Sequence, residues 1–113
     1  MNAKIIKAND GQIQDFGNMK LKNMLNGPEW PFSINWIQRT SNETKEGFES
    51  DQTVAFYILE GSGVVVVNGE TNQISKGDIV AFPRGVRWKF MEGVTLLAIS
   101  NPPYDRSKRK YTE

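Results

Sequence analysis

Acidic, phenolic and amine side chains must carry any proton chemistry of this chain, because its 113 residues include neither histidine nor cysteine. The absence of imidazole excludes the commonest general base, the Ser-His-Asp triad and every imidazole-ligated zinc, iron or copper site. The absence of thiol excludes disulfides, thiolate metal sites and cysteine nucleophiles. Proton transfer would therefore depend on Asp, Glu, Tyr or Lys.

Two tryptophans and one arginine are the side chains best suited to recognising a ligand. Trp36 and Trp88 are each the single tryptophan of a segment that is predicted to be a strand. Each offers either core packing, which is the commoner role, or a flat surface on which a sugar face or planar ring can stack. Arg39 suits bidentate pairing with a carboxylate or phosphate, although an exposed strand-end arginine is the commoner explanation.

The segments that contain these residues are predicted to be β-strands. Glycines recur about every eight residues between positions 61 and 93, and they separate short runs rich in Val, Ile, Phe and Tyr, a spacing typical of a sandwich or barrel. Asn68-Gly69 favours a two-residue type I′ turn and predicts a hairpin over 63–74. The other strands predicted in this region are 54–59, 79–82, 86–91 and 94–100, and no segment from 54 to 100 has a helical period.

The N-terminal half and the C-terminus have weaker patterns. Residues 3–8 and 32–39 look like strands, whereas 18–26 fits a strand or one or two helical turns. The polar stretch 39–51 is interpreted as a loop. The basic residues of 105–113 predict a solvated, mobile tail.

Length and charge limit the class of protein. At 12.8 kDa the chain is expected to form one domain, residues 1–113. Lys and Arg number 14 against 13 Asp and Glu, which does not suit a nucleic-acid binder. No apolar run resembles a signal peptide or a membrane span, so we expect a soluble, cytoplasmic protein without a membrane partner.

The order of motifs between residues 48 and 90 resembles the small single-domain cupins. The segments that carry this resemblance are Phe56-Tyr57-Ile58-Leu59-Glu60-Gly61, Val67-Asn68-Gly69-Glu70, Lys76-Gly77-Asp78-Ile79-Val80 and Phe82-Pro83-Arg84-Gly85-Val86. The resemblance implies an all-β fold, an antiparallel jelly-roll barrel of the cupin type, with a small-molecule site in its interior. It also implies a homodimer, because small cupins commonly pair.

The metal-ligand positions of the family are not kept in this sequence. Counting from Gly61 and from Pro83 places them at Phe48, Ser50, Val54 and Trp88, which bind transition metals poorly or not at all. We therefore expect no metal and no cofactor. A shift of one residue would instead place Glu49 and Asp51 at two of the positions, where their carboxylates would suit a hard cation such as Mg²⁺ or Ca²⁺.

An apolar, aromatic interior leaves three classes of function open. The first is a metal-free protein that binds a small polar or carbohydrate-like metabolite inside the barrel. The second is a metal-independent sugar isomerase, epimerase or lyase, and the third is a filled barrel with a structural or dimerisation role. No catalytic residue is assigned. The predicted ligand-binding residues are Trp36, Arg39, Phe48, Ser50, Gln52, Trp88 and Phe90.

Overall fold

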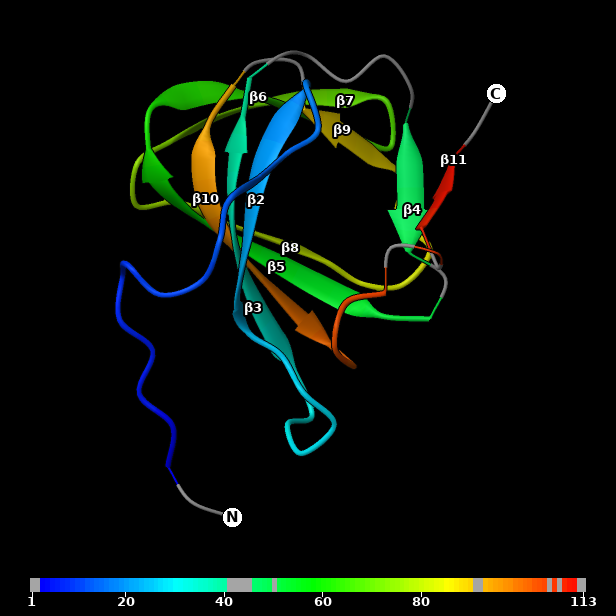
Figure 1. Ribbon diagram of the computed structural model, residues 1–113. Coiled ribbons are helices and arrows are strands. Elements are labelled where there is room, and N and C mark those ends of the chain that lie inside the picture. The colour runs from blue at the N-terminus through cyan, green and yellow to red at the C-terminus, as the bar shows by residue number, and fades with distance from the viewer. Residues whose placement is uncertain are drawn as a thin grey trace.

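The protein folds as two antiparallel sheets that face each other (Figure 1). The computed structural model describes residues 3–40, 46–49, 51–90, 93–105, 107 and 109–111. One sheet has the strand order β1-β2-β3-β10-β5-β8 and the other the order β11-β4-β9-β6-β7. The strands are β1 (Gln14–Asp15), β2 (Met19–Leu25), β3 (Ser33–Arg39), β4 (Gly47–Glu49), β5 (Thr53–Glu60), β6 (Ser62–Val67), β7 (Glu70–Ser75), β8 (Ile79–Phe82), β9 (Trp88–Phe90), β10 (Thr95–Asn101) and β11 (Arg109–Tyr111).

This arrangement confirms the predicted all-β jelly roll. The hairpin of β6 and β7 turns at Asn68 and Gly69, whose φ angles of 49° and 82° are the left-handed values that a type I′ turn requires. Val54, Phe56 and Ile58 alternate along β5 and all point into the core. Among the described residues, no helix is long and apolar enough to span a membrane.

An aromatic cluster fills the space between the sheets. The Trp88 ring stacks on Phe82 at a centroid distance of 4.8 Å and meets Phe56 edge-on at 5.1 Å. Phe90 lies 5.5 Å from Phe56 and is fully buried. One side of the barrel interior is therefore closed by packed rings, and any site must lie beside them.

Three segments differ from the sequence-based predictions. Residues 3–8 form no strand, and Ile5 is 79% exposed. The predicted loop 39–51 contains β4, which begins at Gly47, and residues 41–45 and 50 fall outside the described part. The C-terminal tail was expected to be solvated, but its residues 109–111 form β11 and pair with β4 (Figure 1).

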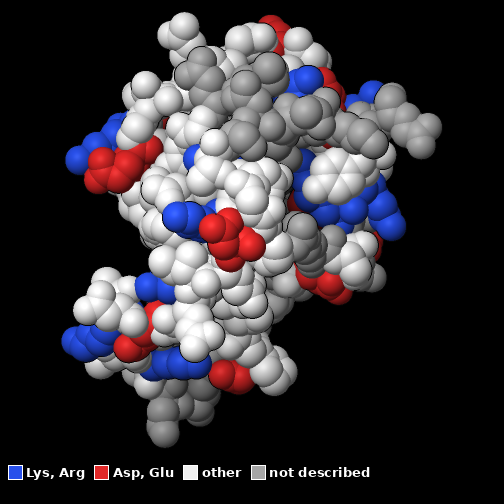
Figure 2. Space-filling model, turned by 45° about the horizontal axis from the view of Figure 1, so that its top comes forward, with Lys and Arg blue, Asp and Glu red and all other residues white. Residues whose placement is uncertain are grey.

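On the face shown in Figure 2, acidic and basic groups are both scattered among uncharged ones, and neither sign covers the face. This distribution agrees with the nearly balanced composition of the chain.

Candidate functional site

Two short strands place the polar residues of the candidate site. Gly47 of β4 pairs with Trp88 of β9, and Glu49 of β4 pairs with Arg109 of β11. Side chains alternate along a strand, so Gly47 and Glu49 share the inward face of β4 while Phe48 lies on the other face. The inward positions opposite Trp88 are thus residues 47 and 49.

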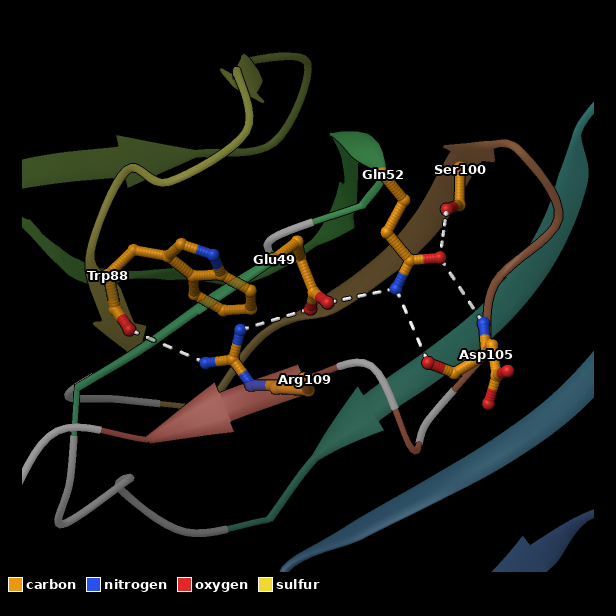
Figure 3. A network of polar contacts seen from close by, with 6 residues as sticks. All are labelled: Glu49, Gln52, Trp88, Ser100, Asp105 and Arg109. Atoms are coloured by element: carbon orange, nitrogen blue, oxygen red, sulfur yellow. Dashed lines mark hydrogen bonds and ion pairs between the residues drawn. The ribbon is translucent and has the colours of Figure 1, made fainter.

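Glu49 and Arg109 form a buried ion pair (Figure 3). Nη1 of Arg109 lies 3.2 Å from Oε1 of Glu49, and the two side chains are only 6% and 3% exposed. The guanidinium carbon stands 3.9 Å from the centre of the Trp88 ring, and Nη2 donates to the Trp88 carbonyl oxygen at 3.5 Å. Arginine suits this position because its flat, weakly hydrated cation pairs with a carboxylate and stacks on an aromatic ring at the same time.

Gly47 provides the space that the guanidinium occupies. A Cβ atom on residue 47 would stand 2.6 Å from Nη2 of Arg109 and 2.8 Å from the carbonyl oxygen of Lys110. Any side chain at this position would therefore displace Arg109 or the backbone of β11. The strand alternation, the ion pair and this glycine together fix the guanidinium between β4, β9 and β11.

Gln52 anchors the second oxygen of Glu49. Its amide nitrogen donates to Oε2 of Glu49 at 2.8 Å and to the carbonyl oxygen of Asp105 at 3.4 Å. Its amide oxygen accepts from the Ser100 hydroxyl at 3.3 Å and from the Asp105 backbone N–H at 3.2 Å. The carboxylate is consequently held from two sides, by an amide and by a guanidinium (Figure 3).

A cavity of about 80 Å³ lies next to this network. It lies between the two sheets, and strand β11 closes one side. The side chains around it are Asn18, Met19, Leu21, Asn35, Ile37, Arg39, Glu49, Val54, Phe56, Trp88, Ala98, Ser100, Tyr104, Arg109 and Tyr111. Among the described residues, the charged groups in this lining are two guanidiniums and one carboxylate.

Two polar atoms in almost fully buried residues of the lining have no hydrogen-bond partner within the described part of the chain. They are Oδ1 of Asn35 and Nε1 of Trp88, in side chains that are only 5% and 3% exposed. Buried polar groups are nearly always paired, and leaving one unpaired costs about 1–3 kcal/mol. Asn35 and Trp88 both belong to the lining of the cavity.

The structure brings together some of the residues predicted to bind a ligand. Arg39 and Trp88 line the cavity, and Gln52 reaches it through Glu49. Phe90 is a core residue whose ring lies 5.4 Å from the guanidinium carbon of Arg39. Trp36 and Phe48 do not line the cavity, because their side chains lie on the faces of β3 and β4 that point away from it. Ser50 falls outside the described residues.

Sequence reasoning missed most of the other polar residues of the site. Asn35, Tyr104, Arg109 and Tyr111 were not assigned to it, and Glu49 was considered only as a ligand for a hard cation. The available signal for Arg109 and Tyr111 was their two-residue spacing, which places both on one face of a strand.

The residues present do not fit a metal ion. Of the inward positions 47, 49, 54 and 88, only Glu49 offers an oxygen ligand, and it is already paired with Arg109. Asp51, the other candidate for a hard cation, is exposed. The described residues contain no group of three or more acidic side chains that could hold a metal. One carboxylate beside a fixed cation is a poor site for Mg²⁺ or Ca²⁺.

Comparisons with known proteins agree on the fold. Residues 42–95 match the model of a family described as Cupin domain. The uncharacterized protein SCO3923 of Streptomyces coelicolor is 26% identical over 99 residues, which cover 85% of each chain.

Solved structures of low sequence identity share the whole architecture. The Streptomyces nucleoside dehydratase Pac13 superposes with a TM-score of 0.83 at 13% identity, over 99% of this chain and 92% of Pac13. Variants of Pac13 have been solved with uridine. KdgF from a Halomonas species gives a TM-score of 0.78 at 14% identity, over 94% of this chain and 99% of KdgF.

Proposed function

We propose that this chain, which has the cupin fold and whose residues 42–95 match the Cupin domain model, binds a small polar or carbohydrate-like metabolite inside its barrel without a metal ion. The observation that carries the proposal is the cavity in which charged groups from both sheets meet an aromatic wall. Arg39, Glu49 and Arg109 contribute the charges, and Trp88 contributes the ring. Apolar walls with a few fixed polar groups are the usual composition of a small-molecule site.

The unpaired atoms of Asn35 and Trp88 support the same proposal. A ligand hydroxyl could donate to Oδ1 of Asn35 and accept from Nε1 of Trp88, which would remove two unfavourable groups from the interior. The likeness to Pac13, which has been solved with uridine, also supports a ligand that combines a ring with hydroxyl groups.

A thermal-shift screen followed by calorimetry tests this function. The screen should include nucleosides such as uridine, neutral sugars, sugar acids and nucleotide sugars. We expect at least one class to raise the melting temperature and to bind with one site per chain. Trp88→Phe should weaken that binding, whereas Trp36→Phe is the matched control, because Trp36 lies on the outer face of β3. A complete lack of stabilisation by every class would favour the filled barrel instead.

A metal-independent lyase, isomerase or epimerase is the second candidate, and Glu49 favours it. Glu49 is the carboxylate among the described cavity residues, and Gln52 and Arg109 fix its two oxygens. Such a carboxylate could take a proton from a ligand carbon as general base. In an elimination it would return that proton to the departing hydroxyl, which leaves as water. The likeness to a nucleoside dehydratase agrees with this role.

Proton exchange in D₂O separates this enzyme from a binding protein. A bound ligand whose C–H proton exchanges with solvent in the presence of wild type, but not of Glu49→Gln, would support catalysis. Unchanged C–H signals of a ligand that demonstrably binds would contradict it.

We also propose that the chain forms a homodimer, and the outer face of the six-stranded sheet supports this. Two cross-strand rows on this face are wholly apolar, namely Ile34, Ile99, Ala55 and Ala81, and Trp36, Leu97, Tyr57 and Ile79. Ile79 is 69% exposed and Tyr57 41%. The two rows span four strands and about four residues along each strand, which is roughly 250 Å², and an uncharged patch is complementary to itself. Light scattering of wild type and of Tyr57→Lys tests this; a monomeric wild type would contradict it.

A further inference from the structure

Arg109 covers the Trp88 ring where a ligand ring would stack on it (Figure 3). Its guanidinium carbon lies 3.9 Å from the ring centre, a contact distance that leaves no room for another group between them. A ligand that uses Trp88 as its aromatic wall therefore has to take the place of this guanidinium. We infer that strand β11 is a lid that carries Arg109, and that the site opens when β11 separates from β4. The inference rests on the proposed binding function and specifies how its ligand gains access.

The other rings around Trp88 belong to the core. Phe82 stacks on it at 4.8 Å, and Phe56 and Phe90 meet it edge-on at 5.1 and 5.6 Å. These three side chains are at most 4% exposed, and a close-packed core does not release them without losing its packing. Of the groups that contact the Trp88 ring, Arg109 is the one carried by a short strand at the edge of a sheet.

The attachment of β11 is slight. It is the edge strand of the five-stranded sheet, and its ladder to β4 joins three residue pairs, against six between β10 and β3. Lys110 and Tyr111 are exposed, so the side chain that β11 buries is that of Arg109. Edge segments with few buried contacts open at a lower free energy than the core of a domain. Separation of β11 alone is therefore expected to occur without unfolding of the barrel.

The buried ion pair is compatible with such opening. Substitution of Glu49 or Arg109 alone leaves one charge buried without its partner, which is costly. When β11 separates from β4, both charges reach water together, and their recovered hydration offsets much of the lost attraction. The pair is thus sensitive to mutation but not a lock on the lid.

The chain is anchored just before the lid. The backbone N–H of Asp105 donates to the amide oxygen of Gln52 at 3.2 Å, and the backbone N–H of Tyr104 donates to the Ser33 hydroxyl at 2.8 Å. Both contacts precede β11, so β11 can separate while they persist. Gln52 also holds Glu49 at 2.8 Å, which keeps the carboxylate in place beside the uncovered ring (Figure 3).

An engineered disulfide between β4 and β11 tests the lid. Phe48 and Lys110 are register partners whose side chains alternate with those that face the cavity. Residues paired in this way across antiparallel strands are close enough for a disulfide. Because the chain has no cysteine, Phe48→Cys/Lys110→Cys forms a single bond that oxidation closes and dithiothreitol opens. The reduced form of the same protein is the matched control.

Hydrogen exchange in D₂O, followed by nitrogen-15 NMR, is the readout. It needs no ligand, because solvent itself probes access to the buried indole N–H of Trp88, whose signal the spectrum of Trp88→Phe identifies. In the reduced protein we expect the amides of 109–111 to exchange about tenfold or more faster than those of β10. Oxidation should slow both these amides and the Trp88 indole by about tenfold or more. The indole of Trp36, on the outer face of β3, should exchange equally in both forms.

A second variant tests the role of Arg109 without a disulfide. Glu49→Gln/Arg109→Gln removes the ion pair and leaves no lone buried charge. Its Trp88 indole should exchange about tenfold or more faster than in wild type, measured relative to the β10 amides, which correct for a change in overall stability. Arg84→Gln removes a positive charge from an exposed turn and should leave this ratio within about twofold of wild type. If the disulfide does not form, this variant decides.

Three results would overturn the lid. They are amides of β11 that exchange as slowly as those of β10, Trp88 exchange that oxidation leaves unchanged, and Trp88 exchange that the double variant leaves unchanged. The proposed binding function is judged separately, by the ligand screen. A metabolite that binds while the disulfide has no effect on Trp88 exchange would refute only the lid. Exchange that follows the disulfide, without any ligand in the screen, would support the lid and count against the binding function.

Discussion

The burial of the Glu49–Arg109 ion pair leads to a prediction about the stability of variants that lack one or both charges. Replacing either residue by Gln removes one charge and leaves the other in a side chain that is 3% or 6% exposed. A buried charge without its partner is strongly destabilising, whereas the loss of both charges together is far better tolerated. The two substitutions should therefore be non-additive.

The magnitude follows from the burial of the pair. Each single variant should lose about 3–5 kcal/mol of unfolding free energy, with Glu49→Gln toward the lower end because Arg109 keeps its contact with the Trp88 ring. The double variant should lose only about 2–4 kcal/mol, since two amides can still hydrogen-bond to each other and to Gln52. With losses of about 3 and 4–5 kcal/mol for the single variants and about 3 kcal/mol for the double variant, the coupling energy is about 4–5 kcal/mol, close to the roughly 4 kcal/mol expected for unit charges 4 Å apart at an effective dielectric constant of 20.

Urea denaturation of wild type, both single variants and the double variant measures this cycle. Tryptophan fluorescence is a suitable signal because Arg109 lies on the Trp88 ring. Equal denaturant slopes across the four proteins would show that the same transition is compared. Single losses that add to within about 1 kcal/mol in the double variant would refute the buried pair, because independent surface charges behave in that way.

Three further changes test neighbouring parts of the argument. Gly47→Ala should cost about 1–3 kcal/mol in denaturant titration because its Cβ would meet Nη2 of Arg109 at 2.6 Å and a β11 carbonyl at 2.8 Å, and an unchanged midpoint would contradict this. Trp88→Ala should cost about 3–5 kcal/mol, since the ring is only 3% exposed and stacks on Phe82, whereas a loss below about 2 kcal/mol would mean that the ring contributes little to the core. Elemental analysis of protein purified without added metal should find less than about 0.1 equivalent of Mn, Fe, Ni or Zn, and a near-stoichiometric amount would refute the metal-free proposal.

The strands with strong local patterns were predictable from the sequence. The Asn68-Gly69 turn fixes one hairpin, and the strand predicted over 79–82 has the bounds of β8. β5 follows from its alternating apolar residues. The two strands that complete the site carry no such pattern: β4 and β11 have three residues each, and their register joins residues 49 and 109, which are 60 positions apart. A pairing between residues so distant in sequence produces no local pattern from which either strand could be predicted.

The inward residues of β4 differ by one position from those counted in the sequence, and that difference matters. Counting placed Phe48 on the inward face, whereas the structure has Gly47 and Glu49 there. Because side chains alternate with a period of two, a shift of one residue moves every side chain to the other face of the strand. A strand expected to turn Phe48 and Ser50 inward therefore presents Gly47 and the carboxylate of Glu49 instead.

The same geometry explains why a histidine at residue 47 and Arg109 exclude each other in this barrel. A histidine side chain at residue 47 would have to begin with a Cβ that stands 2.6 Å from Nη2 of Arg109. Arg109 would then have to leave the Trp88 ring and the Glu49 carboxylate, and Glu49 would remain buried without a counter-charge. Gly47→His alone should consequently destabilise the fold by more than Gly47→Ala, whereas Gly47→His combined with Arg109→Ala should recover part of that loss in denaturant titration. If the two histidine-containing proteins are equally stable, removing Arg109 relieves no clash with residue 47, and the claim that the two side chains exclude each other is wrong.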